Sequence, residues 1–222
     1  MMSATGFLQR QLGLVVAPAR EAFVTVAPEV ILLSAFVDSR PLRQEIAAIE
    51  RAAPFRHLTT PGGGRMSVAM TNCGAVGWHS DARGYRYLER DPLTDRAWPA
   101  MPMSFRALAL RAVATAGFPA FDPDCCLVNR YAIGTQMGTH RDFDERDLAQ
   151  PIVSVSIGLP AIFMWYGAQR RGPKVDVPVS DGDVIVWGGS ARAGYHGVRR
   201  LRDDRTGIEP PLRYNLTFRR AR

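Results

Sequence analysis

A tight-turn signal leads directly into an apolar run in the stretch Asp181-Gly182-Asp183-Val184-Ile185-Val186-Trp187. Aspartate and glycine favour tight turns, and a short apolar run after such a turn predicts a buried strand. Further strands separated by turns are predicted on both sides of this stretch, over residues 127–131, 152–159 and 213–218. A second half built from short strands indicates a double-sheet jelly roll.

The first half of the chain is predicted to contain two helices. A cap at Ser39 and apolar residues at helical spacing predict the first helix, which extends to about residue 52. Ser104 is predicted to cap a second helix over residues 105–116, which Gly117 would end. Helices ahead of many strands indicate an α+β fold, with the helices packed on one outer face of the jelly roll. Three strands are also predicted in this half, over residues 30–33, 66–70 and 83–88.

The length of the chain suits one sizeable domain. Since 46% of the 222 residues are hydrophobic, residues 1–222 are expected to form a single domain, and a monomer is expected. Within that domain, residues from 1 to about 60 would form an N-terminal extension and a helix. Residues from about 125 to 222 would form the jelly-roll core.

The charge of the chain bears on the class of its partner. The net charge is +7, and the basic residues are overwhelmingly arginine, which binds phosphates with a planar fork. A polyanionic partner and an ordinary basic soluble protein are equally consistent with this charge.

The cysteines Cys73, Cys125 and Cys126 have no zinc-type spacing and are too few for a disulfide framework. No apolar stretch reaches transmembrane length, so a cytoplasmic protein without a membrane partner is expected.

A candidate metal site begins at His140-Arg141-Asp142 and is completed by His196. On an extended segment, side chains two residues apart project to the same face, so His140 and Asp142 can reach one ion. His196 would then approach from another strand, where Gly194 and Gly197 leave room for a close backbone. Two imidazoles and one carboxylate are the ligand set of non-haem Fe(II) oxygenases. The alternative is a surface histidine–aspartate pair together with a core histidine satisfied by hydrogen bonds.

A second candidate site lies on the predicted terminal strand. Alternation places Arg213, Asn215, Thr217 and Arg219 on one face of this strand. Cations inside a sheet are costly unless paired, so the two arginines could receive the two carboxylates of a dicarboxylic acid. Asn129 and Tyr131, two residues apart on their own strand, could add an amide and a phenol. The alternative is an edge strand whose arginines face water.

Several motifs follow one another in a fixed order along the chain. They are Met66–Gly74, Gly77-Trp78, Gly84-Tyr85, Trp98–Pro102, Asn129-Arg130-Tyr131, the His140-x-Asp142 pair with Asp144-Glu145, Pro151–Ser156, Gly182-Asp183-Val184, His196 and Arg213–Arg219. Together they resemble the AlkB family of Fe(II)- and 2-oxoglutarate-dependent dioxygenases, in particular its bacterial branch, which acts in the repair of alkylated DNA. The resemblance covers roughly residues 60 to 220.

The resemblance implies a cofactor and a co-substrate. Fe(II) would be held by His140, Asp142 and His196. The co-substrate 2-oxoglutarate would be held by Asn129, Tyr131, Arg213, Asn215 and Arg219, and which arginine takes which carboxylate stays open.

The resemblance also implies a nucleotide-recognition lid over residues 61 to 100 or so. Within it, Trp78 would stack on the damaged base and Tyr85 would lie beside it, with Arg86 and Tyr87 near the nucleic-acid backbone. Asp144 would contact the exocyclic amino group of the base, and Arg170 would also lie at the substrate. Aromatic rings and a carboxylate suit a cationic base, and a base that pairs poorly is more easily flipped out.

The implied reaction is oxidative demethylation of N-alkylated bases such as 1-methyladenine and 3-methylcytosine. Consumption of O2 and 2-oxoglutarate would give succinate and CO2, and the hydroxylated N-methyl group would leave as formaldehyde. The substrate would be single-stranded or double-stranded DNA, with RNA as an alternative. Two other hypotheses remain, a dioxygenase of the same fold acting on modified RNA or protein, and a non-catalytic metal-binding barrel.

Overall fold

A large antiparallel sheet forms the middle of the molecule. The computed structural model describes residues 21–202, 207 and 210–222, and the N-terminal part of the expected extension, residues 1–20, lies outside this range. The large sheet has eight strands. In spatial order they are β1 (Phe23–Ala27), β2 (Val30–Leu33), β14 (Val184–Trp187), β11 (Ile152–Gly158), β16 (Leu212–Arg219), β9 (Cys125–Ala132), β4 (Arg65–Gly74) and β3 (Arg56–Thr59).

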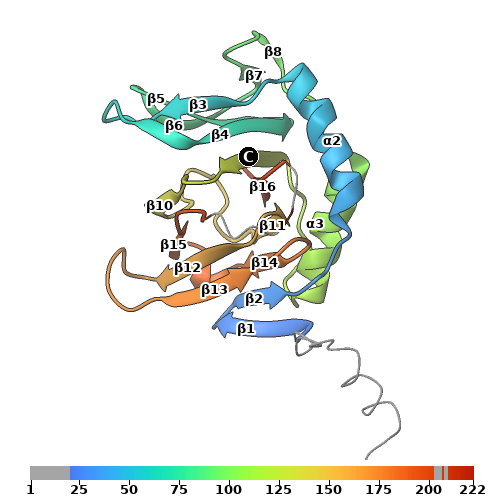
Figure 1. Ribbon diagram of the computed structural model, residues 1–222, viewed down its shortest axis with the longest axis vertical. Coiled ribbons are helices and arrows are strands. Elements are labelled where there is room, and N and C mark those ends of the chain that lie inside the picture. The colour runs from blue at the N-terminus through green and yellow to red at the C-terminus, as the bar shows by residue number, and fades with distance from the viewer. Residues whose placement is uncertain (1–20, 203–206, 208–209) are drawn as a thin grey trace, which may run out of the picture.

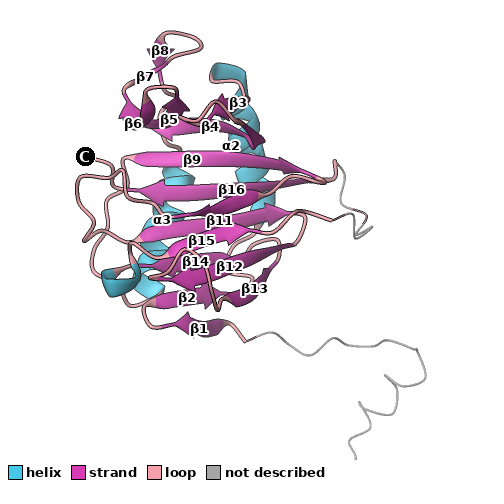
Figure 2. Cartoon of the chain, turned by 90° about the vertical axis from the view of Figure 1, so that its left-hand side faces the viewer, coloured by secondary structure: helices cyan, strands magenta, loops and turns pink. Residues whose placement is uncertain are grey.

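A smaller sheet faces the large one (Figure 2). It has four strands, in the spatial order β10 (Met137–His140), β15 (Tyr195–Val198), β12 (Ala161–Gly167) and β13 (Val175–Val179). Two short hairpins lie near β3 and β4 in the upper part of Figure 1, the second of them at the top. They consist of β5 (Gly77–Asp81) with β6 (Gly84–Leu88), and β7 (Arg90–Asp91) with β8 (Arg96–Ala97). Every predicted strand overlaps one of these elements, although β4 continues four residues beyond its predicted end and β9 begins two residues earlier than predicted.

Two helices cover the other face of the large sheet, α2 (Ser39–Ala52) and α3 (Met103–Thr115) (Figure 1). The apolar stripe of α2, Leu42, Ile46 and Ile49, is buried in the layer between the helices and the sheet. Complete burial of such side chains contributes about 1.5 to 3 kcal/mol each. Both predicted helices and their packing on one outer face are therefore confirmed.

The predicted helix caps are wrong at two positions. Asp38, not Ser39, caps α2, because its carboxylate accepts a hydrogen bond from the backbone N–H of Arg40 at 3.1 Å. Ser104 lies inside α3, which follows Pro102 without a side-chain cap. The predicted end of α3 at Gly117 is correct, since Gly117 has a φ of +80° and its N–H donates to the carbonyl of Ala114.

Alternation along the strands gives the large sheet two buried faces. On β14, Val184 and Val186 face the helices, whereas Ile185 and Trp187 face the smaller sheet. The turn before β14 requires a glycine, because Gly182 has a φ of +82° and a Cβ there would clash with the carbonyl of Val37. The turn and strand of residues 181–187 therefore lie inside the jelly roll, with β14 between β2 and β11.

The large sheet extends beyond the range expected for the core. Strands β1 to β4, which precede residue 125, add to both of its edges. The range 61–100, expected to form a lid, is divided, since β4 belongs to the large sheet and β5 to β8 form separate hairpins. No helix in the described part of the chain is long and apolar enough to span a membrane.

Candidate active site

A cavity of about 520 Å³ lies between the two sheets. Its walls come from both sheets and from the hairpin of β5 and β6, so segments from much of the chain contribute to it. The inner face of β16 contributes Arg213, Asn215, Thr217 and Arg219. β16 lies between β11 and β9, so the alternative of a water-facing edge strand is wrong.

His140, Asp142 and His196 meet at one end of this cavity. His140 ends β10 and lies directly opposite His196 of β15 in the antiparallel register. Asp142 follows two residues after His140, and its carboxylate oxygens lie 3.8 Å from Nε2 of His140 and 3.9 Å from Nε2 of His196. All three candidate ligand atoms lie within 4.8 Å of one another, which permits them to share one metal ion.

The backbone fixes both imidazoles in a metal-binding tautomer. Nδ1 of His140 lies 2.9 Å from the carbonyl of Gly138, and Nδ1 of His196 lies 3.0 Å from the carbonyl of Gly194. Because a carbonyl only accepts, each Nδ1 must carry the proton and each Nε2 keeps a free lone pair. Gly194 is also required sterically, since a Cβ there would clash with the ring of Trp165.

Electrostatics favour the protonation states that a metal needs. Burial by itself raises the pKa of Asp142, but Arg219 and the two imidazoles outweigh it and hold that pKa below its usual range. Burial, aided by His140, lowers the pKa of His196 to about 3 despite the nearby Asp142. At neutral pH the site therefore presents a carboxylate and a neutral imidazole at its two buried positions. The two-histidine, one-carboxylate set fits Fe(II) with positions left for other ligands.

Deeper in the cavity lies a buried cation that has no counter-ion among the described residues. Arg213 is 2% exposed, donates from Nη2 to the hydroxyl of Ser156 at 3.1 Å and lies 4.8 Å from the ring centroid of Tyr131. Its Nε and Nη1 have no hydrogen-bond partner among the described residues. An unsatisfied buried guanidinium is costly, so these donors fit a ligand carboxylate.

Amide and hydroxyl side chains line the cavity between Arg213 and Arg219. Asn215 donates to the hydroxyl of Ser154 at 2.8 Å and accepts from Thr217 at 2.9 Å. Asn129 contacts Asn215 through its Nδ2 at 3.4 Å, and its Oδ1 is a further buried atom without a partner within the described ranges. Nη1 of Arg219 is also unpartnered there, although its Nη2 contacts Asp142 at 2.8 Å. These free polar atoms fit 2-oxoglutarate, a dicarboxylate with a keto group.

Four of the six predicted substrate residues lie at the mouth of the cavity. Trp78 and Tyr85 stack with ring centroids 5.5 Å apart, and Nε1 of Trp78 donates to Asp144 at 2.9 Å. Arg170 also lines the cavity. The other two have partners elsewhere.

Arg86 and Tyr87 do not line this cavity. Arg86 pairs with both carboxylate oxygens of Asp81 within its own hairpin, at 2.7 and 2.6 Å. Tyr87 donates its hydroxyl to Glu145 at 2.5 Å. Both side chains are thus engaged within the protein.

Comparison with known proteins identifies the family. The family model described as the 2OG-Fe(II) oxygenase superfamily matches residues 29–219. The chain is 49% identical over 187 residues to the alpha-ketoglutarate-dependent dioxygenase AlkB of Escherichia coli, which covers 84% of this chain and 87% of that protein. The chain belongs to the AlkB family of 2OG-Fe(II) oxygenases. This AlkB-family protein is therefore an Fe(II)- and 2-oxoglutarate-dependent dioxygenase, and the expected jelly-roll class is confirmed.

Two further similarities extend the comparison. The solved structure described as "The structure of OsALKBH1" superposes with a TM-score of 0.76 at 25% identity, covering 89% of this chain and 99% of that one. The DNA N(6)-methyladenine demethylase ALKBH1C of Arabidopsis thaliana is 34% identical over 172 residues, which is 65% of this chain and 37% of the relative. The AlkB-family jelly roll of this chain thus has a closely matching solved counterpart.

A buried ionic network that no sequence pattern indicates lies behind the candidate metal ligands. Glu145 accepts hydrogen bonds from Tyr87 and, at 3.0 Å, from Arg192, and it lies 3.4 Å from Arg219. Arg192 also donates to the backbone carbonyl of Asp142 at 2.8 Å. The network therefore holds the loop that carries Asp142, a candidate iron ligand of this AlkB-family protein. Ser154 and Ser156 were missed too, although polar residues at alternate positions of an apolar strand were a readable signal.

Proposed function

We propose that the protein oxidatively demethylates N-alkylated bases such as 1-methyladenine and 3-methylcytosine in DNA, with RNA as an alternative substrate. The reaction uses Fe(II), O2 and 2-oxoglutarate and releases formaldehyde, succinate and CO2. One observation carries the proposal. A single cavity combines a two-histidine, one-carboxylate site, a buried arginine with no ion pair to any described residue, and an aromatic mouth with a carboxylate. The DNA named for the Arabidopsis relative supports the choice of substrate.

His140, Asp142 and His196 would hold the iron, which when bound supplies the O2-dependent oxidation of the methyl group. The protein keeps the imidazole of His196 neutral and the carboxylate of Asp142 ionised, as their surroundings favour. The rings of Phe163 and Trp187 flank His196, with centroids 5.6 and 4.9 Å away. This apolar wall excludes water from the deep side of the site.

The co-substrate would bind along β16. Arg219 contacts the ligand Asp142, so it lies at the metal end and would receive the carboxylate next to the keto group. Arg213 lies deeper, beside Tyr131 and Ser156, and would receive the distal carboxylate. Asn129 and Asn215 line the same cavity and would hydrogen-bond the ligand between these two ends.

The flipped base would enter between the aromatic mouth and the metal. Trp78 would stack on its face, with Tyr85 supporting the indole from behind. Asp144, oriented by the indole N–H, would accept a hydrogen bond from the exocyclic amino group and favour a cationic base. These residues would select a methylated, positively charged base over its neutral parent.

Arginines at the cavity would attract the phosphates. Arg65, Arg141 and Arg170 line it, and none of them forms an ion pair with any residue that the structure describes. Such free cations favour a polyanion. Contacts of Arg86 and Tyr87 with the nucleic acid stay predictions, since Asp81 and Glu145 already engage these side chains. We further propose a cytoplasmic monomer, with which three buried free cysteines are compatible.

The proposal is tested by product release. Fe(II), 2-oxoglutarate and ascorbate under air, with an oligonucleotide carrying one 3-methylcytosine, should yield formaldehyde and succinate in equal amounts. The unmethylated twin should yield no formaldehyde. Succinate release that the methyl group does not increase, without formaldehyde, would leave the oxygenase and remove the substrate. Neither product from any oligonucleotide would favour the non-catalytic barrel.

Replacing Trp78 with alanine should weaken binding of the methylated oligonucleotide, because base stacking contributes roughly 1 to 3 kcal/mol. Succinate release without substrate should persist, since the metal and 2-oxoglutarate sites are untouched. Trp78→Phe keeps an aromatic face and loses the hydrogen bond to Asp144, so its affinity should be intermediate. Fluorescence anisotropy would measure the three affinities. Equal affinities would remove Trp78 from base recognition.

A further inference from the structure

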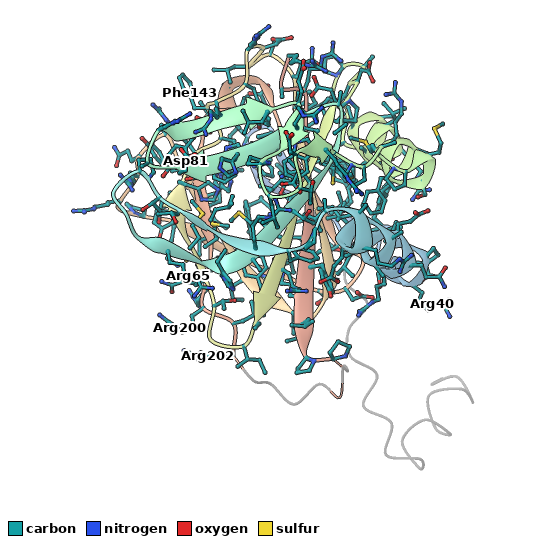
Figure 3. The ribbon with its side chains drawn as sticks, turned by 90° about the horizontal axis from the view of Figure 1, so that it is seen from above. Arg40, Arg65, Asp81, Phe143, Arg200 and Arg202 are labelled. Carbon is teal, nitrogen blue, oxygen red and sulfur yellow. The ribbon has the colours of Figure 1, made fainter. Side chains whose placement is uncertain are left out.

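An exposed phenylalanine lies between two acidic residues of the site. Asp142 and Asp144 both line the cavity, whereas the side chain of Phe143 is 49% exposed. Phe143 does not line the cavity, so its ring lies on the surface beside the two acidic residues. In Figure 3, Phe143 lies on the left-hand side of the molecule, the same side as Asp81 of the hairpin of β5 and β6. Phe143 is thus one residue from the proposed base-recognition carboxylate.

Exposure alone would carry no conclusion, because single exposed apolar residues are common. The ring of Phe143, however, forms a cation–π contact with Arg141. Cζ of Arg141 lies 4.5 Å from the ring centroid of Phe143 and 5.4 Å from that of Tyr195, so the guanidinium contacts two aromatic rings. Arg141 forms no ion pair with any described residue and also lines the cavity. The result is a preformed aromatic–cationic surface, Phe143–Arg141–Tyr195, which we name the rim platform.

We propose that the rim platform binds the nucleotide next to the flipped base, with its base stacked on Phe143 and its phosphate near Arg141. The proposal rests on the proposed function and specifies the substrate as a strand with at least one neighbouring base. Aromatic faces with adjacent arginines bind single-stranded nucleic acid in this manner, because every base has a π-face and every nucleotide a phosphate. A base beside an empty position has lost one stacking partner, and Phe143 replaces it.

The chemistry of the platform favours this occupant over others. A carboxylate-rich peptide would pair with Arg141 but would gain nothing from the exposed ring. An apolar partner would cover the ring but would leave a guanidinium without an anion. A nucleotide satisfies both groups at once. It is also the class of ligand that the adjoining cavity is proposed to receive.

A binding measurement tests the platform without depending on turnover. The probe is a fluorescein-labelled pentanucleotide with a central 3-methylcytosine, titrated with protein loaded with Mn(II) and 2-oxoglutarate. Two further probes lack the base on the 5′ or the 3′ side of the lesion. Phe143→Ala should weaken binding of the intact probe about five- to twentyfold. Wild type and variant should bind equally to one of the two abasic probes, because that probe lacks the base that stacks on Phe143. That probe therefore shows whether the stacked base lies on the 5′ or the 3′ side of the lesion.

Two variants separate stacking from an effect on the fold. Phe143→Trp keeps an aromatic face and should bind the intact probe at least as tightly as wild type. Phe23→Ala removes another exposed phenylalanine, 47% exposed on β1, and should change nothing. Equal binding of the intact probe by wild type and Phe143→Ala overturns the platform. A loss of the same size on all three probes also overturns it, because the ring would then act without a neighbouring base.

The two proposals can fail separately. Phe143→Ala could weaken binding only when the flanking base is present, while no methylated probe yields formaldehyde. This result would support the rim platform and contradict the proposed demethylation. Formaldehyde release with no effect of Phe143→Ala on binding would keep the demethylation and remove the platform.

Discussion

Replacing Asp142 with alanine is expected to abolish methyl-dependent release of formaldehyde and succinate. The variant keeps His140 and His196, but it loses the only carboxylate in the candidate metal site of the described residues. Loss of an outer partner of a metal ligand typically costs about 10- to 100-fold, and loss of the ligand itself should exceed that range. In a thermal melt, Mn(II) should stabilise the wild type and leave Asp142→Ala unchanged, because a ligand stabilises only the state that binds it.

The same substitution should also destabilise the metal-free protein. Asp142 is buried and contacts Arg219 at 2.8 Å, so its removal weakens the pairing of a buried cation. Breaking a buried ion pair from one side costs about 3 to 5 kcal/mol, although Glu145 at 3.4 Å would retain part of the pairing. Activity must therefore be measured at a temperature at which circular dichroism shows the variant folded.

Asp147→Ala is the matched control, because Asp147 is an exposed carboxylate in the same loop that, among the described residues, hydrogen-bonds only to Ala149 and Gln150. It should retain full activity and the full Mn(II) stabilisation. Turnover by folded Asp142→Ala within tenfold of wild type would remove Asp142 from the metal site.

Much of this site could be predicted from the sequence because strand alternation is strict. In a strand over residues 213–219, Arg213 and Arg219 must share a face with Asn215, and the structure places all three in the cavity. In the same way, the two-residue spacing of His140 and Asp142 predicted that both side chains could reach one ion, and their side chains lie 3.8 Å apart. The approach of His196 from another strand is also confirmed, although its pairing with His140 depends on the register of two sheet strands that no local pattern specifies.

Other features depend on tertiary contacts that leave no periodic signal. Glu145 and Arg192 are 47 residues apart in sequence, and only the folded chain shows that each is almost completely buried against the other. Strands β10, β13 and β15 have four or five residues each, too short for a clear alternation to stand out beside nearby glycines and prolines. The substrate roles of Arg86 and Tyr87 came from resemblance alone, and their partners in this chain are internal.

Replacing Arg213 with methionine is expected to have opposite effects on function and on stability. The requirement for 2-oxoglutarate should rise by roughly 30-fold or more, because truncating one side of a buried charged pair costs about 2 to 5 kcal/mol. In the protein without co-substrate, however, Arg213 is a buried cation with two unpartnered nitrogens within the described residues, and burial lowers its pKa. An apolar side chain of similar length removes that desolvation cost, so the melting temperature of the free protein should stay unchanged or increase.

Arg130→Met provides the comparison for this variant. Arg130 lies directly opposite Tyr214 in the register of β9 and β16, on the helix-facing side, where it pairs with Glu50 at 2.7 Å. Its replacement should leave the 2-oxoglutarate requirement unchanged and should lower stability slightly, since a partly exposed pair contributes little. Succinate release as a function of 2-oxoglutarate concentration, with thermal melts in its presence and absence, gives both readouts. A free protein strongly destabilised by Arg213→Met would mean that Arg213 is a structural residue. An unchanged 2-oxoglutarate requirement would mean that the distal carboxylate binds elsewhere.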